Sequence, residues 1–89
     1  MEARKIIITG GATRIGAAIA KKLSGPNREL VLHFNKSKSK AENLKKKLEY
    51  YGAKVYLAKG DLSKEKDIIK IIKVAKSKLK YFDCLVNNA

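Results

Sequence analysis

The 89-residue sequence contains no tryptophan and only one residue each of cysteine, histidine, proline and methionine. The single cysteine, Cys84, cannot form a disulfide framework within the chain, which suits a reducing compartment, and we expect a cytoplasmic protein. The single histidine, His33, provides no metal-binding cluster, so we expect no bound metal. No apolar stretch approaches the roughly 20 residues of a transmembrane helix, and no secretory signal is recognisable.

Acidic residues are also scarce, with 8 Asp and Glu against 21 Lys and Arg and a formal net charge of +13. Such an excess can indicate a nucleic-acid partner, since phosphate neutralisation dominates that kind of binding. Here the basic residues are mostly lysines spread over the expected helices, and no basic patch alternates with aromatic residues as a stacking surface would need. We therefore favour a solvated lysine-rich surface, which would still attract small phosphate-bearing ligands.

Strand and helix patterns alternate along the chain. Short apolar, partly β-branched runs predict strands at residues 5–9, 29–34, 54–58 and 83–86. Helical spacing of apolar residues predicts helices at residues 14–23, from 39 to about 51, and from about 64 to 79. This alternation requires an α/β fold with a parallel sheet and right-handed crossovers, within one small domain.

The expected helix ends and apolar faces are specific enough to test. Ser39 and Glu42 have the spacing of a capping box, Gly52 would end that helix, and Ser63 is the expected N-cap of the third helix. The residues expected to face the sheet are Ile15, Ala18, Ile19 and Leu23 in the first helix, Ala41, Leu44, Leu48 and Tyr51 in the second, and Ile68, Ile69, Ile71, Ile72, Ala75 and Leu79 in the third.

The first strand runs into the glycine-rich turn TGGATRIG, residues 9–16. Glycines let such a turn bend tightly and approach a ligand, and the helix behind it offers free N–H groups and the positive end of its dipole to a phosphate. Gly16 would also let that helix pack closely on the sheet. The turn does not have the G-x-G-x-x-G form, so by itself it fits a simple turn as well as a nucleotide site.

The segment after the second strand has no acidic residue between Glu29 and Glu42. In dinucleotide-binding folds an acid about 20 residues past the glycines bonds the adenosine ribose 2′-OH. Lys36 and Ser37, with Arg14 nearby, would instead suit the 2′-phosphate of NADP. The alternative is an exposed polar loop.

Polar residues also follow the third and fourth strands. Asp61, in GDLS, could accept a hydrogen bond from an adenine amino group or could cap the next helix. Asn87 and Asn88 could tie neighbouring strands together or contact a ribose. Each of these residues, taken alone, is as readily structural as functional.

Together, TGGATRIG, HFNKS, GDLS and LVNNA occur in the order and spacing of the short-chain dehydrogenase/reductase family, and the chain resembles the amino-terminal part of that family over nearly all its length. The family pattern T-G-x-x-x-G-x-G is matched at Thr9, Gly10, Ile15 and Gly16 and departs at Arg14, where glycine is usual. This arginine, with the His-aromatic-x-basic-Ser run after the second strand, is similar to pteridine reductases; 3-oxoacyl-carrier-protein reductases are the other look-alike.

The resemblance implies a Rossmann-type parallel sheet of strand order 3-2-1-4 with helices on both faces, truncated after the fourth strand, so that residues 1–89 form the amino-terminal part of one NAD(P)-binding domain. It implies NADP as the cofactor, with NADPH preferred over NADH. The cofactor-binding residues that it implies are Gly10, Gly11, Ala12, Thr13, Arg14, Ile15, Gly16, Asn35, Lys36, Ser37, Asp61, Leu62, Asn88 and Ala89.

The same resemblance implies a homo-oligomeric parent enzyme that reduces a small carbonyl or pterin substrate. The catalytic Ser, Tyr and Lys of the family lie beyond the LVNNA motif, and none of the tyrosines here (Tyr50, Tyr51, Tyr56 and Tyr81) matches the catalytic position, so we expect no catalytic residue in this chain. A nucleotide-binding module without a reductase active site is the alternative. Because Cys84, Leu85 and Val86 would form an exposed strand edge, we expect the 89-residue chain to be marginally stable or to self-associate.

Overall fold

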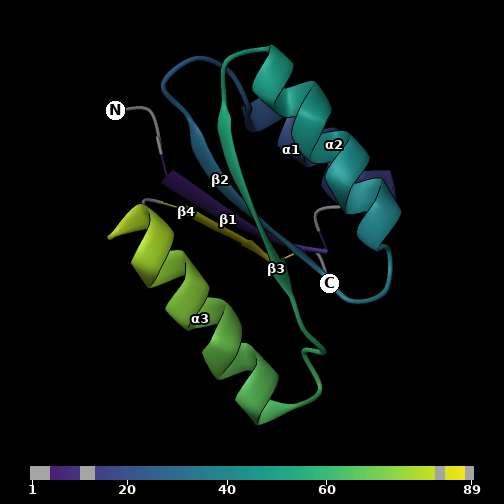
Figure 1. Cartoon of the computed structure of the whole chain (residues 1–89), viewed down its shortest axis with the longest axis vertical. Coiled ribbons are helices and arrows are strands. Elements are labelled where there is room, and N and C mark those ends of the chain that lie inside the picture. The colour runs from purple at the N-terminus through teal and green to yellow at the C-terminus, as the bar shows by residue number, and fades with distance from the viewer. Residues whose placement is uncertain (1–4, 11–13, 82–83, 88–89) are drawn as a thin grey trace.

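The computed structural model describes residues 5–10, 14–81 and 84–87. In these residues strands and helices alternate, as the sequence pattern predicts (Figure 1). The elements are β1 (Lys5–Thr9), α1 (Arg14–Leu23), β2 (Glu29–Phe34), α2 (Lys38–Tyr50), β3 (Lys54–Lys59), α3 (Glu65–Leu79) and β4 (Cys84–Asn87).

The strands form one sheet in the order β3-β2-β1-β4, and every neighbouring pair is parallel. The registers align Ile7 of β1 with Val31 of β2 and with Leu85 of β4. This topology confirms the expected Rossmann-type α/β fold and its strand order. The fourth strand was expected to include Asp83, which lies outside the described residues.

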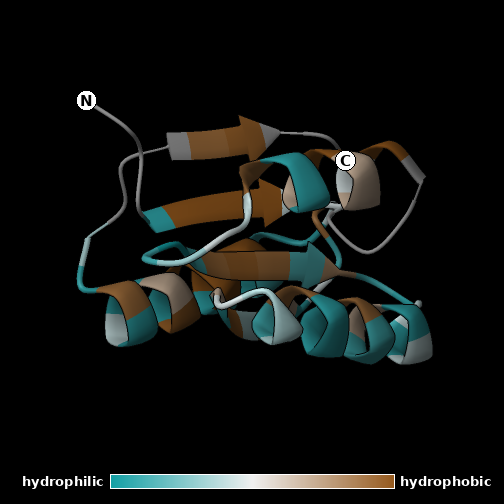
Figure 2. Cartoon of the chain, turned by 90° about the horizontal axis from the view of Figure 1, so that it is seen from above, coloured by the Kyte–Doolittle hydropathy of each residue, from teal (hydrophilic) through white to brown (hydrophobic). Residues whose placement is uncertain are grey.

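Helices cover both faces of the sheet, with α1 and α2 on one side and α3 on the other (Figure 1). Because successive side chains of a strand point to opposite faces, Ile6 and Ile8 of β1 lie in the core beneath α1 and α2, and Ile7 lies in the core beneath α3. The strands are accordingly almost continuously hydrophobic in Figure 2, whereas the helices carry both hydrophobic and hydrophilic stretches. Burial of one such aliphatic side chain stabilises a fold by about 1.5–3 kcal/mol.

The expected packing face of α1 is wrong in two of its four positions. Ile15 is 68% exposed and Ala18 is exposed, whereas Gly16 and Ala20 are buried. Gly16 and Ala20 are one turn apart and lie on the same side of the helix. The buried side of α1 therefore includes these two small residues, and Ala17, Ile19 and Leu23 also pack against the core.

The expected faces of α2 and α3 are only partly confirmed. Ala41, Leu44 and Leu48 of α2 are buried, but Tyr51 lies past the end of the helix and is exposed. In α3 the expectation holds for three buried residues and fails for three that remain exposed. The buried residues are Ile71, Ala75 and Leu79, and the exposed ones are Ile68, Ile69 and Ile72.

Both serine caps expected from the sequence are wrong. The N-cap of α2 is Ser37, whose side chain makes no capping bond within the described residues, and Ser39 lies inside the first turn. The N-cap of α3 is Lys64, while Ser63 bonds Asp61 in the preceding turn. Serine hydroxyls readily bond local turns in place of caps.

The predicted end of α2 at Gly52 is confirmed. Gly52 has φ +100°, a conformation that favours glycine, and its amide donates to the carbonyl of Glu49.

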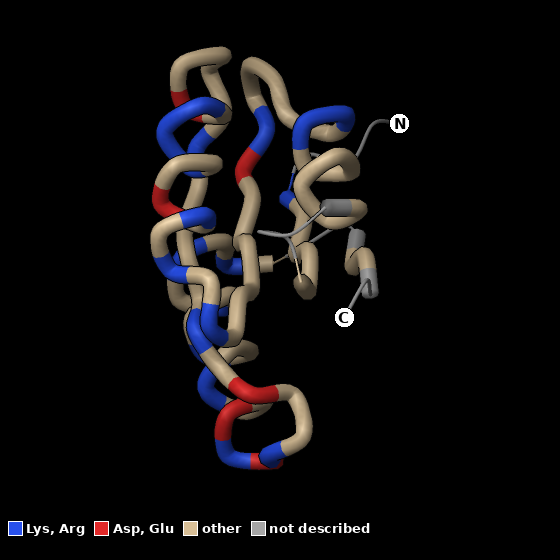
Figure 3. The backbone as a smooth tube through the Cα atoms, turned by 90° about the vertical axis from the view of Figure 1, so that its right-hand side faces the viewer, with Lys and Arg blue, Asp and Glu red and all other residues tan. Residues whose placement is uncertain are grey.

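The helices carry most of the basic residues on exposed positions, and basic segments recur along the whole height of the molecule in Figure 3. The exposed lysines of α2 and α3 are Lys38, Lys40, Lys46, Lys47, Lys66, Lys70, Lys73, Lys76 and Lys78. Such a distribution fits a solvated surface. Over the described part of the chain, the helices are too short or too polar to cross a membrane.

Candidate functional site

The loops that carry the sequence motifs leave the sheet at its carboxyl edge. Gly10 directly follows β1, Asn35 follows β2 and Gly60 follows β3. Because all the strands are parallel, these three loops share one edge, which is where ligands bind in open α/β sheets. The structure thus brings together the motif segments after the first three strands, which lie about 25 residues apart in the sequence.

The glycine-rich turn begins at Gly10, whose φ of +63° lies in the left-handed region that favours glycine. Helix α1 starts at Arg14, close behind the turn, so its first amides face the same edge. The exposed side chain of Ile15 stands at this end of the helix, and Gly16 is buried. The expected site residues Gly11, Ala12 and Thr13 lie outside the described residues, as do Asn88 and Ala89.

His33 connects this turn to the loop after β3. The Gly10 N–H donates to His33 Nδ1 over 2.9 Å, and His33 Nε2 lies 2.8 Å from the Gly60 carbonyl oxygen. The ring is only 3% exposed, and within the described part of the chain it is the one buried polar side chain. The sequence interpretation excluded His33 as a metal ligand and assigned it no role. The available signal in the sequence was a polar ring near the end of an apolar strand.

The loop after β2 presents polar side chains to solvent. Asn35 and Lys36 are exposed, and Ser37 is partly buried at the N-cap of α2. No described acidic side chain forms an ion pair with Lys36. Its charge nevertheless acts on Asp61, because Lys36 is among the groups that lower the pKa of that carboxyl. The positive loop after β2 therefore lies near the loop after β3.

Asp61 organises the β3–α3 loop. Its Oδ1 accepts hydrogen bonds from the Ser63 hydroxyl over 2.7 Å and the Ser63 amide over 2.9 Å. Its own amide donates to Asp67 Oδ2 over 2.9 Å. The Ser63 hydroxyl and then the Ser63 amide lower the pKa of Asp61 below its ordinary value, with smaller contributions from Lys64 and Lys36. Asp61 is therefore a carboxylate at neutral pH.

Close packing fixes the start of the same loop. A Cβ on Gly60 would lie 2.9 Å from Ile71 Cδ1, so glycine allows the end of β3 to approach α3. Leu62, the other expected adenine contact, is partly buried against the core beneath α3. The loop is thus held on both sides of Asp61.

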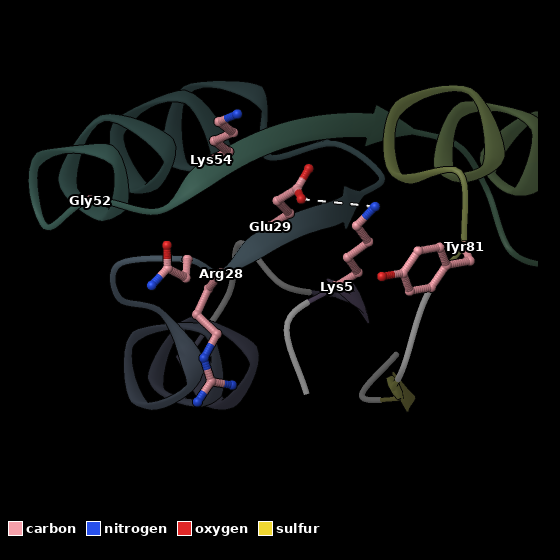
Figure 4. A pocket seen from close by; sticks show the side chains of 7 residues that line it. Lys5, Arg28, Glu29, Gly52, Lys54 and Tyr81 are labelled. Atoms are coloured by element: carbon pink, nitrogen blue, oxygen red, sulfur yellow. Dashed lines mark ion pairs between the residues drawn. The ribbon is translucent and has the colours of Figure 1, made fainter. Parts of the chain in front are cut away.

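A pocket of about 340 Å³ lies at the opposite, amino edge of the sheet, around Lys5, Arg28, Lys54 and Tyr81. The Lys5 ammonium donates to the Leu79 carbonyl over 2.6 Å and lies 4.1 Å from the centre of the Tyr81 ring. In Figure 4 the Lys5 side chain points toward Glu29, while the side chains of Arg28 and Lys54 point away from Glu29. These cations do not converge on one point, so the contacts of Lys5 serve to hold the end of α3.

The tyrosines lie away from the carboxyl edge. Tyr50 and Tyr51 are exposed at the end of α2, and Tyr81 lies beside Lys5 at the amino edge. Tyr56 is within β3. Among the described residues no three His, Cys, Asp or Glu side chains gather as a metal site.

The profile of the short chain dehydrogenase family matches residues 4–89, and the chain belongs to this family. A dehydrogenase/reductase structure from Sinorhizobium meliloti 1021 is 27% identical with a TM-score of 0.91, over 100% of this chain and 35% of that one. A short-chain dehydrogenase from Oenococcus oeni PSU-1 is 35% identical with a TM-score of 0.85, over 97% of this chain and 40% of that one. FolM alternative dihydrofolate reductase 1 from Brucella canis, complexed with NADP, is 28% identical with a TM-score of 0.85, over 97% of this chain and 34% of that one. The chain thus spans 34–40% of the length of these three relatives.

Proposed function

We propose that this chain is the cofactor-binding portion of an NADPH-dependent short-chain oxidoreductase, a carbonyl or pterin-type reductase. The observation that carries the proposal is the gathering of Gly10, Lys36 and Asp61 at one edge of a parallel sheet, in a member of the short chain dehydrogenase family. The NADP complex of the 28% identical FolM relative supports the choice of cofactor. The parent protein would be cytoplasmic and homo-oligomeric.

Each loop would bind a different part of the dinucleotide. The turn from Gly10 to Gly16 and the first amides of α1 would hold the pyrophosphate, which the helix dipole favours. Asn35, Lys36 and Ser37, with Arg14, would meet the adenosine 2′-phosphate. Asp61 and Leu62 would hold the adenine, and Asn88 and Ala89 would lie along the adenosine and nicotinamide side.

The residues present fit such a cofactor. Lys36 is exposed, has no ion-pair partner among the described acids, and stands where NAD-specific sites carry an acid. Asp61 keeps its charge while its Oδ1 is occupied by Ser63. The bound cofactor would supply a hydride for reduction of a C=O or C=N bond, and the residues of this chain would bind and orient it.

A titration of the chain with NADPH and NADH tests the cofactor. We expect tighter binding of NADPH, and we expect Lys36→Gln to weaken NADPH binding about tenfold, because a charge-assisted bond to phosphate is lost. The same substitution should leave NADH binding unchanged. Lys46→Gln, an exposed lysine on α2, is the matched control and should change neither affinity. Equal affinity of the wild-type chain for the two dinucleotides would contradict the roles of Lys36, Ser37 and Arg14.

A nucleotide-binding module without reductase activity is the second candidate. The position of the described tyrosines favours it for the chain alone, because none of them lies at the carboxyl edge. Reading the gene beyond Ala89 distinguishes the two. A glycine followed by a serine and a Tyr-x-x-x-Lys sequence would support the enzyme, and a stop codon would support the module.

A further inference from the structure

The contacts of His33 define its protonation state. Burial of an imidazole costs free energy unless its nitrogens are hydrogen-bonded. Nδ1 accepts from the Gly10 amide, so it carries no proton, and Nε2 must then donate to the Gly60 carbonyl. Only the neutral ring with its proton on Nε2 satisfies both contacts.

The two residues that bond His33, Gly10 and Gly60, follow strands that are not neighbours in the sheet. Gly10 follows β1 and Gly60 follows β3, and β2, which carries His33, lies between them in the sheet. The Gly60 amide also donates to the Phe34 carbonyl over 3.0 Å. Both backbone groups of Gly60 are therefore held by consecutive residues at the end of β2.

We propose that His33 is a positioning residue that holds the glycine-rich turn and the Asp61 loop in the arrangement that binds the dinucleotide. This inference rests on the proposed function. Because the Gly10 amide is directed at Nδ1, the pyrophosphate is bound by amides further along, toward Ile15 and Gly16 at the start of α1. Gly10 thus contributes its left-handed conformation, and His33 holds it there.

Other residue types would not perform this role equally well. Leucine would remove both hydrogen bonds of the His33 ring, the one from the Gly10 N–H and the one to the Gly60 carbonyl, and the loss of such bonds at a buried side chain is costly. Asparagine could place its amide oxygen near the Nδ1 position, but its side chain is too short to put a donor at the Nε2 position. Histidine spans the distance between the two loops, and asparagine retains only the contact to Gly10.

The binding test compares His33→Leu, His33→Asn and Phe34→Leu, with NADPH as the probe and the folded fraction of each variant measured beside it. We expect His33→Leu to weaken NADPH binding about tenfold or more, and His33→Asn to restore part of that loss. Phe34→Leu removes core volume next to His33 without touching its bonds, so binding should be unchanged. Unchanged affinity in His33→Leu, or an equal loss in the Phe34→Leu control, would overturn the inference.

A second measurement does not depend on cofactor binding. In ¹⁵N spectra of the wild-type chain we expect the Nε2–H form of His33 and a scalar coupling between Nδ1 and the Gly10 amide. In His33→Leu the amides of Gly10, Ile15 and Gly16 should exchange faster with solvent. If His33→Leu does not fold, His33→Asn should keep the Gly10 amide slow to exchange, and rapid exchange there would contradict the inference.

The two measurements separate the two claims. If the wild-type chain binds no NADPH but the coupling is present and the turn amides exchange faster in the variant, the proposed function fails for this chain and the positioning role stands. If NADPH binds and the ring carries its proton on Nδ1, or the turn amides are unaffected by His33→Leu, the positioning role fails and the proposed function stands.

Discussion

The two faces of the sheet are covered to different extents. On the face beneath α1 and α2, the row of aligned residues Leu32, Ile8 and Val86 is fully buried in β2 and β1 and half-buried in β4. On the face beneath α3, Val31 is fully buried but Leu85 of β4 is 57% exposed. Helices α1 and α2 shield the first face, and α3 shields the second (Figure 1). The sheet is thus well covered over β2 and open toward β4 on the α3 side.

The open part of the α3 face is a groove of about 340 Å³. Apolar side chains provide most of its lining, from β1, the β3–α3 loop, α3 and β4. The lining residues are Ile7, Thr9, Leu62, Ile68, Ile71, Ile72, Lys76 and Leu85. Of the exposed isoleucines of α3, Ile68 and Ile72 are therefore part of a continuous apolar surface, whereas Ile69 does not line the groove. The difference between the faces can be tested with substitutions of decreasing effect.

The largest effect is expected on the closed face. Leu48 in α2 is 1% exposed, and Leu48→Ala should lower the free energy of unfolding by about 2–5 kcal/mol, because a buried cavity is created. Ile72 in α3 is 46% exposed, and Ile72→Ala should cost about 0.5 kcal/mol. Urea denaturation of the two variants measures both values. Equal losses would mean that the two faces are equally covered.

A smaller loss is expected where β3 meets α3. Gly60→Ala should cost about 1 kcal/mol, because the new methyl group would lie 2.9 Å from Ile71 Cδ1 and the end of that side chain would have to shift. Ile71→Val removes that atom, so the double variant should lose less than the sum of the two single variants. Additive losses in the same denaturation experiment would refute this explanation.

We expect self-association of the chain to depend on the groove, and we expect substitutions of exposed residues there to change the free energy of unfolding only slightly. Ile72 and Ile69 are each 46% exposed on α3, but only Ile72 lines the groove. If the 89-residue chain associates as expected, Ile72→Lys should lower its average mass in analytical ultracentrifugation and Ile69→Lys should not. Equal responses of the two variants would place the association elsewhere, and a strictly monomeric wild-type chain would contradict the expectation itself.

The smallest effect concerns the loop that attaches α3 to the sheet. The Ser63 hydroxyl lowers the pKa of Asp61, so Ser63→Ala should raise it toward the ordinary value of 3.8. Because the folded-state pKa is lowered, the stabilising contribution of Asp61 is present above that ordinary value and is lost as the pH falls through the lowered pKa. An NMR titration of the carboxyl carbon measures the shift. Ser77→Ala, on the exposed side of α3, should leave it unchanged.

The sequence predicted the strands better than the helix faces. The bounds of β1 and β2 follow from continuous apolar runs, because a strand buried on both faces needs apolar residues at every position. In α1 the lysines Lys21 and Lys22 mark the solvent side of the helix, and Ile15 and Ala18 lie on that same side. Gly16 and Ala20 lie on the opposite side and are buried, so the prediction failed because it counted apolar residues and left out the positions of the lysines.

The alternation of elements was enough to predict an α/β fold with a parallel sheet, because a linear sequence carries local periodicity directly. For the candidate site, the resemblance carried by TGGATRIG, HFNKS, GDLS and LVNNA implied the Rossmann-type strand order and the family. The joining of Gly10 and Gly60 through His33 is a property of the folded sheet, because the partners are 23 and 27 residues from the histidine. The groove beside α3 likewise arises only when β4 pairs with β1. Such contacts follow from which strands become neighbours, and that is decided by the packing of the whole chain.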